Sequence, residues 1–150
     1  MLAGQAWAAQ HARQGDQHAM AASEEDCRRE ALLGHARGLA AAERRSLDAL
    51  TRTAAQLTEC PISLVSLVGS DSQHFLSHFG WDIDGGPRDS SFCTHAIARP
   101  DLFEIPDAWQ DPRVRASPLV TGPPHRRAYF AKTLSVDGLP VGTLCVIDKR

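Results

Sequence analysis

The stretch ISLVSLV, Ile62–Val68, decides how this chain folds. Both of its alternating faces carry apolar side chains, and it lies between Pro61 and the turn-forming sequence GSDS. A strand that is apolar on both faces is typical of a sheet covered on both sides. The sequence therefore predicts a central strand here, with other elements packed above and below it.

The segments on either side supply partners for this strand. GSDS has hairpin-turn chemistry, so QHFLSHFG at residues 73–80 is expected to return antiparallel beside it. Near the C-terminus, AYFAKTLSV and VGTLCVID flank the turn sequence DGLP and predict a second hairpin, while residues 102–108 predict an isolated strand. Together these elements predict an α+β fold with a largely antiparallel sheet.

Helices are expected in three places. Apolar residues spaced by three and four positions from Leu32 predict one amphipathic helix that ends near Cys60. Its apolar face would comprise Leu47, Leu50, Ala54 and Leu57. Residues 92–98 predict a short helix that Ser90 or Ser91 caps. The proline-rich residues 111–127 predict a long, partly helical surface excursion, a kind of segment that often carries function.

Composition limits the range of functions. The 150 residues suit one domain, and a formal charge of −2 gives no attraction to nucleic acid or anionic membrane. We expect a cytoplasmic protein because no apolar run approaches a membrane span and no signal peptide is evident. The four cysteines lie at least 33 residues apart, which favours reduced thiols. Residues 1–30 predict a frayed helix or disordered extension, and residues 31–150 the domain.

Several motifs, in this order and spacing, resemble the GAF domains found at the front of bacterial sensor histidine kinases, diguanylate cyclases and other cyclic-di-nucleotide enzymes. They are PISLVSLV, PRDSSFCTHAI, the run from IPDAWQDPR through PLVTGPPHRRAY, and DGLPVGTLCVID. The resemblance implies a central antiparallel sheet with helices on one face and a ligand pocket on the other, roofed by the excursion. It also implies a cytoplasmic sensor in two-component or related signal transduction, which dimerises and biases an output domain.

Some residues depart from the pattern of the family. Phe130 and Lys132 stand where members of this type carry small residues, and they are expected to shrink or recharge the pocket. His74 and Leu76 stand where the family usually has tryptophan and lysine. The chain stops at Asp148-Lys149-Arg150, where the family continues into a closing helix, so we expect either a fragment or a fold without that helix.

The resemblance and the local sequence together nominate ligand-binding candidates: Phe92, Cys93, His95, Asp107, Tyr129, Lys132 and Cys145. Cys93 falls in the first turn of the predicted helix, where the helix dipole favours a thiolate, but a buried cysteine also packs as a small apolar residue. Cys93 and His95 would point about 200° apart on a helix, which argues against a catalytic dyad. For Tyr129, core packing and pocket lining stay equally open.

Other polar groups have a structural interpretation beside the functional one. Asp107 and Asp111 can hold a polar ligand or cap a helix, and the cluster His125, Arg126 and Arg127 suits an anionic ligand or a solvated loop. His74 and His78 are about 13 Å apart on a strand, too far to share a metal. We therefore expect no metal, no catalytic residue, no cofactor beyond an unidentified small molecule, and no enzyme activity.

Three functional hypotheses follow. The first is a small-molecule sensor that forms a homodimer through its N-terminal helix and acts on an output domain or on a separate protein. The second is an interaction module without a ligand, favoured by Phe130 and Lys132 in the expected pocket. The third is a thiol redox sensor that uses Cys93.

Overall fold

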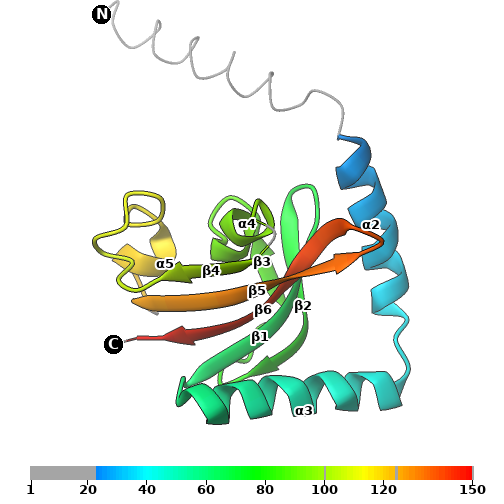
Figure 1. The fold of residues 1–150 in the computed structure, drawn as a ribbon, viewed down its shortest axis with the longest axis horizontal. Helices are drawn as coiled ribbons and strands as arrows, with labels where there is room; N and C mark the ends of the chain where they lie inside the picture. Colours follow the sequence, from blue (N-terminus) through cyan, green and yellow to red (C-terminus); the bar gives the residue numbers. More distant parts are fainter. Residues whose placement is uncertain (1–22, 100, 124, 150) are drawn as a thin grey trace, which may run out of the picture.

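The computed structural model describes residues 23–99, 101–123 and 125–149, and its core is a six-stranded antiparallel sheet (Figure 1). The strand order is β3-β2-β1-β6-β5-β4, and every neighbouring pair is antiparallel. The elements are α2 (Glu24–Arg37), α3 (Ala41–Thr58), β1 (Ile62–Val68), β2 (Ser72–Phe79), β3 (Gly85–Pro87), α4 (Phe92–Ile97), β4 (Leu102–Ile105), α5 (Pro118–Thr121), β5 (Ala128–Val136) and β6 (Leu139–Asp148). The predicted α+β fold with two hairpins is confirmed.

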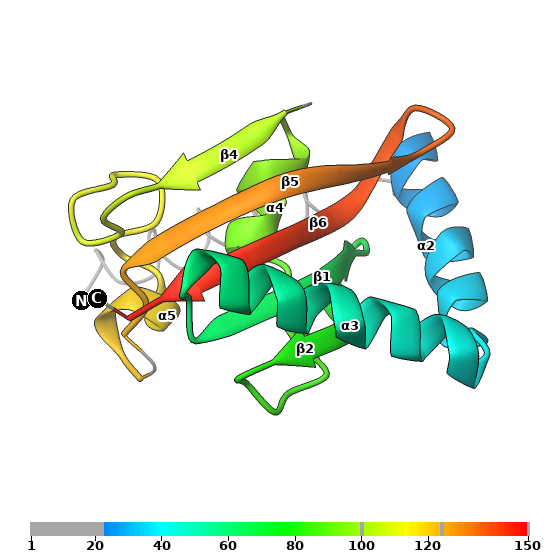
Figure 2. The same ribbon diagram turned by 60° about the horizontal axis from the view of Figure 1, so that its bottom comes forward.

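Both faces of the sheet are covered. Helix α3 runs across one face with α2 beside it, whereas α4 and the excursion that contains α5 lie on the other face (Figures 1 and 2). Strand β1 is buried along its whole length, as predicted. Its Leu64 and Val68 belong to the core on the α4 face, while Leu67 packs with Leu33 of α2 on the opposite face. The central strand therefore contacts both layers.

The predicted single helix from Leu32 to Cys60 is wrong, because two helices occupy that stretch. The first begins at Glu24, where Ser23 accepts a hydrogen bond from the Asp26 amide, and it ends at Gly38. The second begins after Ala40, whose amide donates to the Glu43 side chain at 2.7 Å. The predicted extension over residues 1–30 lies largely outside the described residues, and residues 24–30 within it are helical.

The predicted apolar face of this helical region is only partly correct, because Leu47 and Ala54 are half-buried. Thr51 and Ala55 are the buried residues of α3, whereas Leu50 is 44% exposed and Leu57 is 81% exposed. The reason is a polar contact between α3 and β2, in which the hydroxyls of Thr51 and Ser77 lie 2.9 Å apart. Small side chains allow the helix to approach the sheet closely, and the larger leucines are left on the outer side.

The roof over the other face begins with α4. Its first turn is capped as predicted, because the Ser91 hydroxyl accepts a hydrogen bond from the Cys93 amide at 3.1 Å. Strand β4 pairs with β5, so it is an edge strand of the sheet rather than an isolated one. After β4, two aspartates fold the excursion: Asp107 accepts from the Trp109 amide, and Asp111 accepts from the Arg113 amide. Both contacts hold turns rather than cap a helix, because α5, the helix that the structure describes in this excursion, begins only at Pro118 and is capped by Ser117.

Strand β3 was missed, since its sequence Gly-Gly-Pro has the composition of a turn. Among the described helices, none is long and apolar enough to cross a membrane.

Candidate functional site

A cavity of about 250 Å³ lies between α4 and the excursion, on the roofed face of the sheet. One wall comes from the start of α4 and the other from the excursion; the lining includes Ser90, Ser91, Phe92, His95, Arg113, Val114, Ala116, Ser117 and Pro118. Ser117 closes one side, because its hydroxyl donates to the Ser90 carbonyl at 3.4 Å. The cavity therefore lies within the roof, between α4 and the excursion, and no strand residue is among those that line it.

His95 and Arg113 supply the polar chemistry of this cavity. The guanidinium of Arg113 donates to Asp111 through Nε at 2.8 Å and lies 4.7 Å from the centre of the Phe103 ring. This contact lowers the pKa of Asp111 to about 2. Burial lowers the pKa of His95, and the charge of Arg113 lowers it further. No described residue forms a hydrogen bond with the His95 ring, which lines the cavity.

Beneath α4, three of the predicted residues meet in a buried cluster. The Tyr129 hydroxyl donates to the Cys93 sulfur at 3.3 Å, and the Cys93 and Cys145 thiols are in hydrogen-bonding contact. Ser66 and Thr143, whose hydroxyls lie 3.0 Å apart, also reach this cluster. The contact between the thiols lowers the pKa of Cys93 and raises that of Cys145.

The aromatic rings around this cluster are packed edge to face. Phe92 meets Tyr129 with 5.4 Å between ring centres, and Phe103 meets it at 6.1 Å. Tyr129, Cys93 and Cys145 are all buried in the main core. The ring of Tyr129 therefore packs in the core, and its hydroxyl belongs to the polar cluster beneath α4 rather than to the lining of the cavity.

Two of the predicted ligand residues, Lys132 and Asp107, do not belong to the buried cluster around Tyr129. Lys132 is exposed on the face of β5 opposite to Tyr129, and its nearest charge is Asp101 at 3.6 Å. Phe130 lies on that same outer face, so neither residue fills the pocket as expected. Asp107 forms a two-bond ion pair with Arg127, which lowers the pKa of Asp107.

The three residues of the predicted positive cluster, His125, Arg126 and Arg127, lie at the end of the excursion in three different environments. Arg127 pairs with Asp107, His125 is exposed, and Arg126 turns into the core, where it is 3% exposed. The guanidinium of Arg126 lies 3.8 Å from the centre of the Trp81 ring. Sequence reasoning missed this pair, because Arg126 stands in a polar loop and Trp81 in a turn-rich segment. No periodic pattern there distinguishes an inward arginine from a solvated one.

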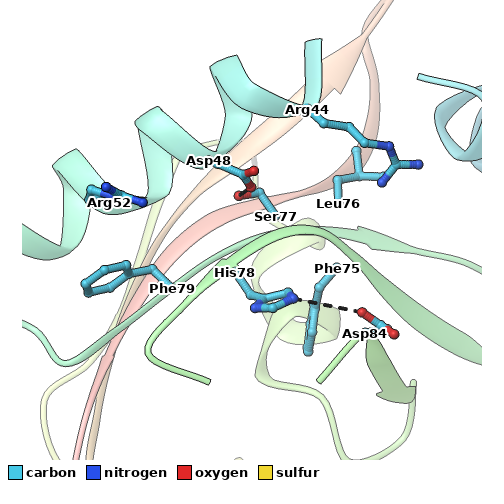
Figure 3. Close-up of a pocket in the computed structure, with 9 residues that line it drawn as sticks. All are labelled: Arg44, Asp48, Arg52, Phe75, Leu76, Ser77, His78, Phe79 and Asp84. Atoms are coloured by element: carbon cyan, nitrogen blue, oxygen red, sulfur yellow. Dashed lines mark hydrogen bonds and ion pairs between the residues drawn. The ribbon is translucent and has the colours of Figure 1, made fainter. Parts of the chain in front are cut away.

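A second hollow of about 370 Å³ lies between α3 and β2, on the opposite face (Figure 3). Its charged groups are engaged in local contacts: Asp48 accepts from the Ser77 hydroxyl at 2.6 Å, and His78 lies 3.9 Å from Asp84. Arg44 donates to the backbone carbonyls of Arg37 and Leu39. These contacts account for the hollow as part of the packing of α3 on the sheet.

The histidines of β2 are not brought together. His74 lies 3.0 Å from the Arg37 guanidinium, and His78 is near Asp84. Within the described ranges, no group of three histidine, cysteine or acidic side chains is arranged to hold a metal ion.

An apolar groove of about 490 Å³ lies where α2, α3 and the β5–β6 hairpin meet. Its lining includes Leu32, Ala36, Leu39, Leu47, Leu67, Leu76, Val136 and Val141. On α3, Leu50 and Leu57 are also exposed. The face opposite to the cavity therefore carries an apolar groove as well as the polar hollow between α3 and β2.

No family model matches the chain. A cyclic di-GMP phosphodiesterase of Pseudomonas aeruginosa is 42% identical over 93 residues, which are 61% of this chain and 16% of that protein. The chain thus spans only a small part of this curated relative.

Solved structures resemble the chain in fold. A GAF domain of a phosphoenolpyruvate-protein phosphotransferase from Coxiella burnetii aligns over 87% of this chain and 81% of its own, with a TM-score of 0.59 at 8% identity. A free methionine-R-sulfoxide reductase from Neisseria meningitidis aligns over 87% and 78%, with a TM-score of 0.56 at 17% identity. The fold is therefore compatible with an enzyme as well as with a regulatory domain. The order of its strands, its two covered faces and these neighbours agree that the chain has a GAF-like fold.

Proposed function

We propose that this chain is a small-molecule-sensing domain of bacterial signal transduction, with its ligand bound between the sheet and the roof formed by α4 and the excursion. The observation that carries the proposal is the cavity at His95 and Arg113, which lies on the same face as the buried Tyr129 cluster. Ligand pockets usually measure about 300–1,000 Å³, so a volume of about 250 Å³ favours a small ligand.

The signal would cross the sheet through its central strand. Ser66 of β1 belongs to the cluster beneath α4, whereas Leu67, the next residue, packs against α2 on the other face. A ligand that binds better to one packing arrangement than to another shifts the population between them. Because β1 contacts α4 on one face and α3 on the other, a shift under the roof would alter the packing of α3.

The partner of α3 is proposed to be a second copy of the chain. Leu50 and Leu57 form an exposed apolar edge on this helix, and exposed apolar patches of this kind favour association. The relative from Pseudomonas carries its matched segment within a much longer protein named as a cyclic di-GMP phosphodiesterase. By analogy, the sensing domain would act in the cytoplasm on a signalling output, either in the same protein or in a separate one.

An interaction module without a ligand is the second candidate, and the exposed leucines of α3 favour it. Phe130 and Lys132 do not favour this interaction module, because both side chains face away from the roofed core and so do not fill the expected pocket. The thiol hypothesis has support in the contact between Cys93 and Cys145, although both are buried. It requires Cys93 to be alkylated much faster than Cys60 at neutral pH.

Native mass spectrometry of the protein as purified tests the sensing proposal. We expect a small mass that is present natively and is removed by denaturation. Ala116→Trp, which fills the cavity from its wall, should abolish the bound mass. The matched control Arg115→Trp changes the neighbouring exposed residue and should keep it. A bare dimer in all three samples would reject the sensing proposal and favour the interaction module.

A further inference from the structure

Arg126 is a buried cation that forms no ion pair with an acidic side chain among the described residues. The side chain is 3% exposed, and neither Nε nor Nη2 forms a hydrogen bond with any described residue. Burial lowers the pKa of this guanidinium to about 10. An unpaired charge in a protein interior is strongly unfavourable. The group therefore calls for a counter-charge.

The guanidinium is held in a defined orientation. It stacks over the Trp81 ring at 3.8 Å, a favourable cation–π distance, and Trp81 in turn packs against Phe75 with 5.9 Å between ring centres. The Arg126 amide donates to the Leu119 carbonyl at 2.9 Å, which anchors the backbone to α5. Trp81 and Leu119 are themselves half-buried.

The two unpaired donors lie on one edge of the guanidinium. Nε–H and Nη2–H are parallel there and match the two oxygens of a carboxylate. The next residue demonstrates this geometry, because Arg127 uses the same two atoms to bind Asp107 with both distances at 2.9 Å. Arg126 presents the same edge without an acidic partner among the described residues.

The charge of Arg126 also acts on buried groups of the roofed face. Its charge interacts with Cys145, Cys93 and Tyr129, which carry thiol and hydroxyl groups and no carboxylate. Tyr129 and the thiols are buried in the core on the roofed face, beneath α4. Arg126 therefore gives this side of the sheet a positive charge.

We infer that Arg126 binds a planar oxyanion, such as the carboxylate group of a small ligand, through Nε and Nη2 above the Trp81 ring. The inference goes beyond the proposed sensing function, because Arg126 is not among the residues that line the cavity at His95 and Arg113, and it names the chemical class of the anion. It also identifies Arg126 as a specificity-determining residue that the sequence pattern did not distinguish from its neighbours.

The experiment measures the thermal denaturation midpoint of the full chain as formate, acetate or nitrate is added, with chloride at matched ionic strength as the reference. In the wild type we expect at least one planar oxyanion to raise the midpoint beyond the effect of chloride, because binding to the native state stabilises it. In Arg126→Met, the same rise should require at least about tenfold more anion, since charge-assisted hydrogen bonds to the fork are lost.

Two further variants make this result specific. Arg52→Met removes an exposed arginine from α3, on the other face, and should respond to the anions as the wild type does. Arg126→Lys keeps the positive charge without the planar guanidinium and should bind the anion more weakly than the wild type. This variant replaces Arg126→Met in the test if Arg126→Met does not fold. An equal response of the wild type and the Arg126 variants would overturn the inference.

The outcomes also separate this inference from the proposed function. If native mass spectrometry finds a bound small molecule but no oxyanion stabilises the wild type beyond chloride, the oxyanion site is wrong and the sensing function stands. If Arg126→Met changes only the rate of Cys93 alkylation, the guanidinium serves the thiol cluster and the inference is also overturned. Absence of both a bound mass and an anion response rejects the two proposals together.

Discussion

At the residue scale, the hydroxyl of Tyr129 is the most instructive group on the roofed face. It is fully buried and donates to the Cys93 sulfur at 3.3 Å. We predict that Tyr129→Phe lowers the free energy of unfolding by about 1 kcal/mol, a typical value for a lost buried hydrogen bond. Urea denaturation measures this loss.

The control for this prediction lies on the next residue. Phe130→Leu changes a ring on the outer face of β5 and should alter the free energy of unfolding by less than about 0.5 kcal/mol. An equal loss in both variants would show that the Tyr129 hydroxyl contributes nothing specific.

His95 makes stability depend on pH. Its pKa is lowered from 6.5 by burial and by Arg113, so the unfolded chain binds more protons than the native one at pH values just below 6.5. The contribution of His95 to stability is therefore present above pH 6.5 and is lost as the pH falls below it. We predict that the free-energy difference between wild type and His95→Asn is larger at pH 7.5 than at pH 5.5.

Chemical denaturation at the two pH values measures that difference, and the other histidines cancel because both proteins carry them. A difference that is constant, or larger at pH 5.5, would contradict the assigned environment of His95.

At the element scale, the strands could be predicted because their patterns are strong. A strand such as β1, with apolar residues on both faces, is typical of the middle of a covered sheet, and both hairpins have recognisable turns. The face of α3 could not be predicted, because a periodicity argument assumes that the larger apolar side chains point inward. Here Thr51 and Ser77 form the contact between helix and sheet, which only tertiary packing reveals.

The pairing of β1 with β6 depends on Gly142. A Cβ atom at this position would lie 1.8 Å from the Ser66 carbonyl oxygen, so the two strands approach too closely for any side chain. We predict that Gly142→Ala lowers the free energy of unfolding by about 3 kcal/mol or more. Gly34→Ala is the control: Gly34 lies in α2 with free space around it, and alanine should stabilise that helix by up to about 1 kcal/mol.

Denaturant titration of both glycine variants checks the prediction. If Gly142→Ala were as stable as the wild type, the close approach of β1 and β6 would be wrong.

The outer side of α3 is predicted to be a dimer contact. Leu57→Glu should leave the stability of the monomer nearly unchanged, because the side chain is 81% exposed, but it should weaken dimerisation at least about tenfold. Gln56→Glu adds the same charge at a neighbouring exposed position outside the leucine edge. Sedimentation analysis over a concentration series distinguishes them, and an equal effect of the two substitutions would argue against this contact.

At the scale of the whole molecule, the candidate site was only partly visible in the sequence. The resemblance pointed to Phe92, Cys93, His95 and Tyr129, and the structure brings these residues to one face. Lys132 does not reach this face, because successive residues of β5 alternate between the two faces of the sheet and Lys132 lies opposite to Tyr129. Arg126 could not be recognised, because the direction of a loop side chain depends on the packing of Trp81 and α5 around it.

The central claim is that binding under the roof alters α3 on the other side of the sheet. Hydrogen–deuterium exchange of α3 amides tests it most directly, comparing the protein as purified with Ala116→Trp and Arg115→Trp. We predict that exchange within Ala41–Thr58 changes in Ala116→Trp, which cannot hold the ligand, and stays at the wild-type rate in Arg115→Trp. Identical exchange in α3 for all three proteins would contradict the account.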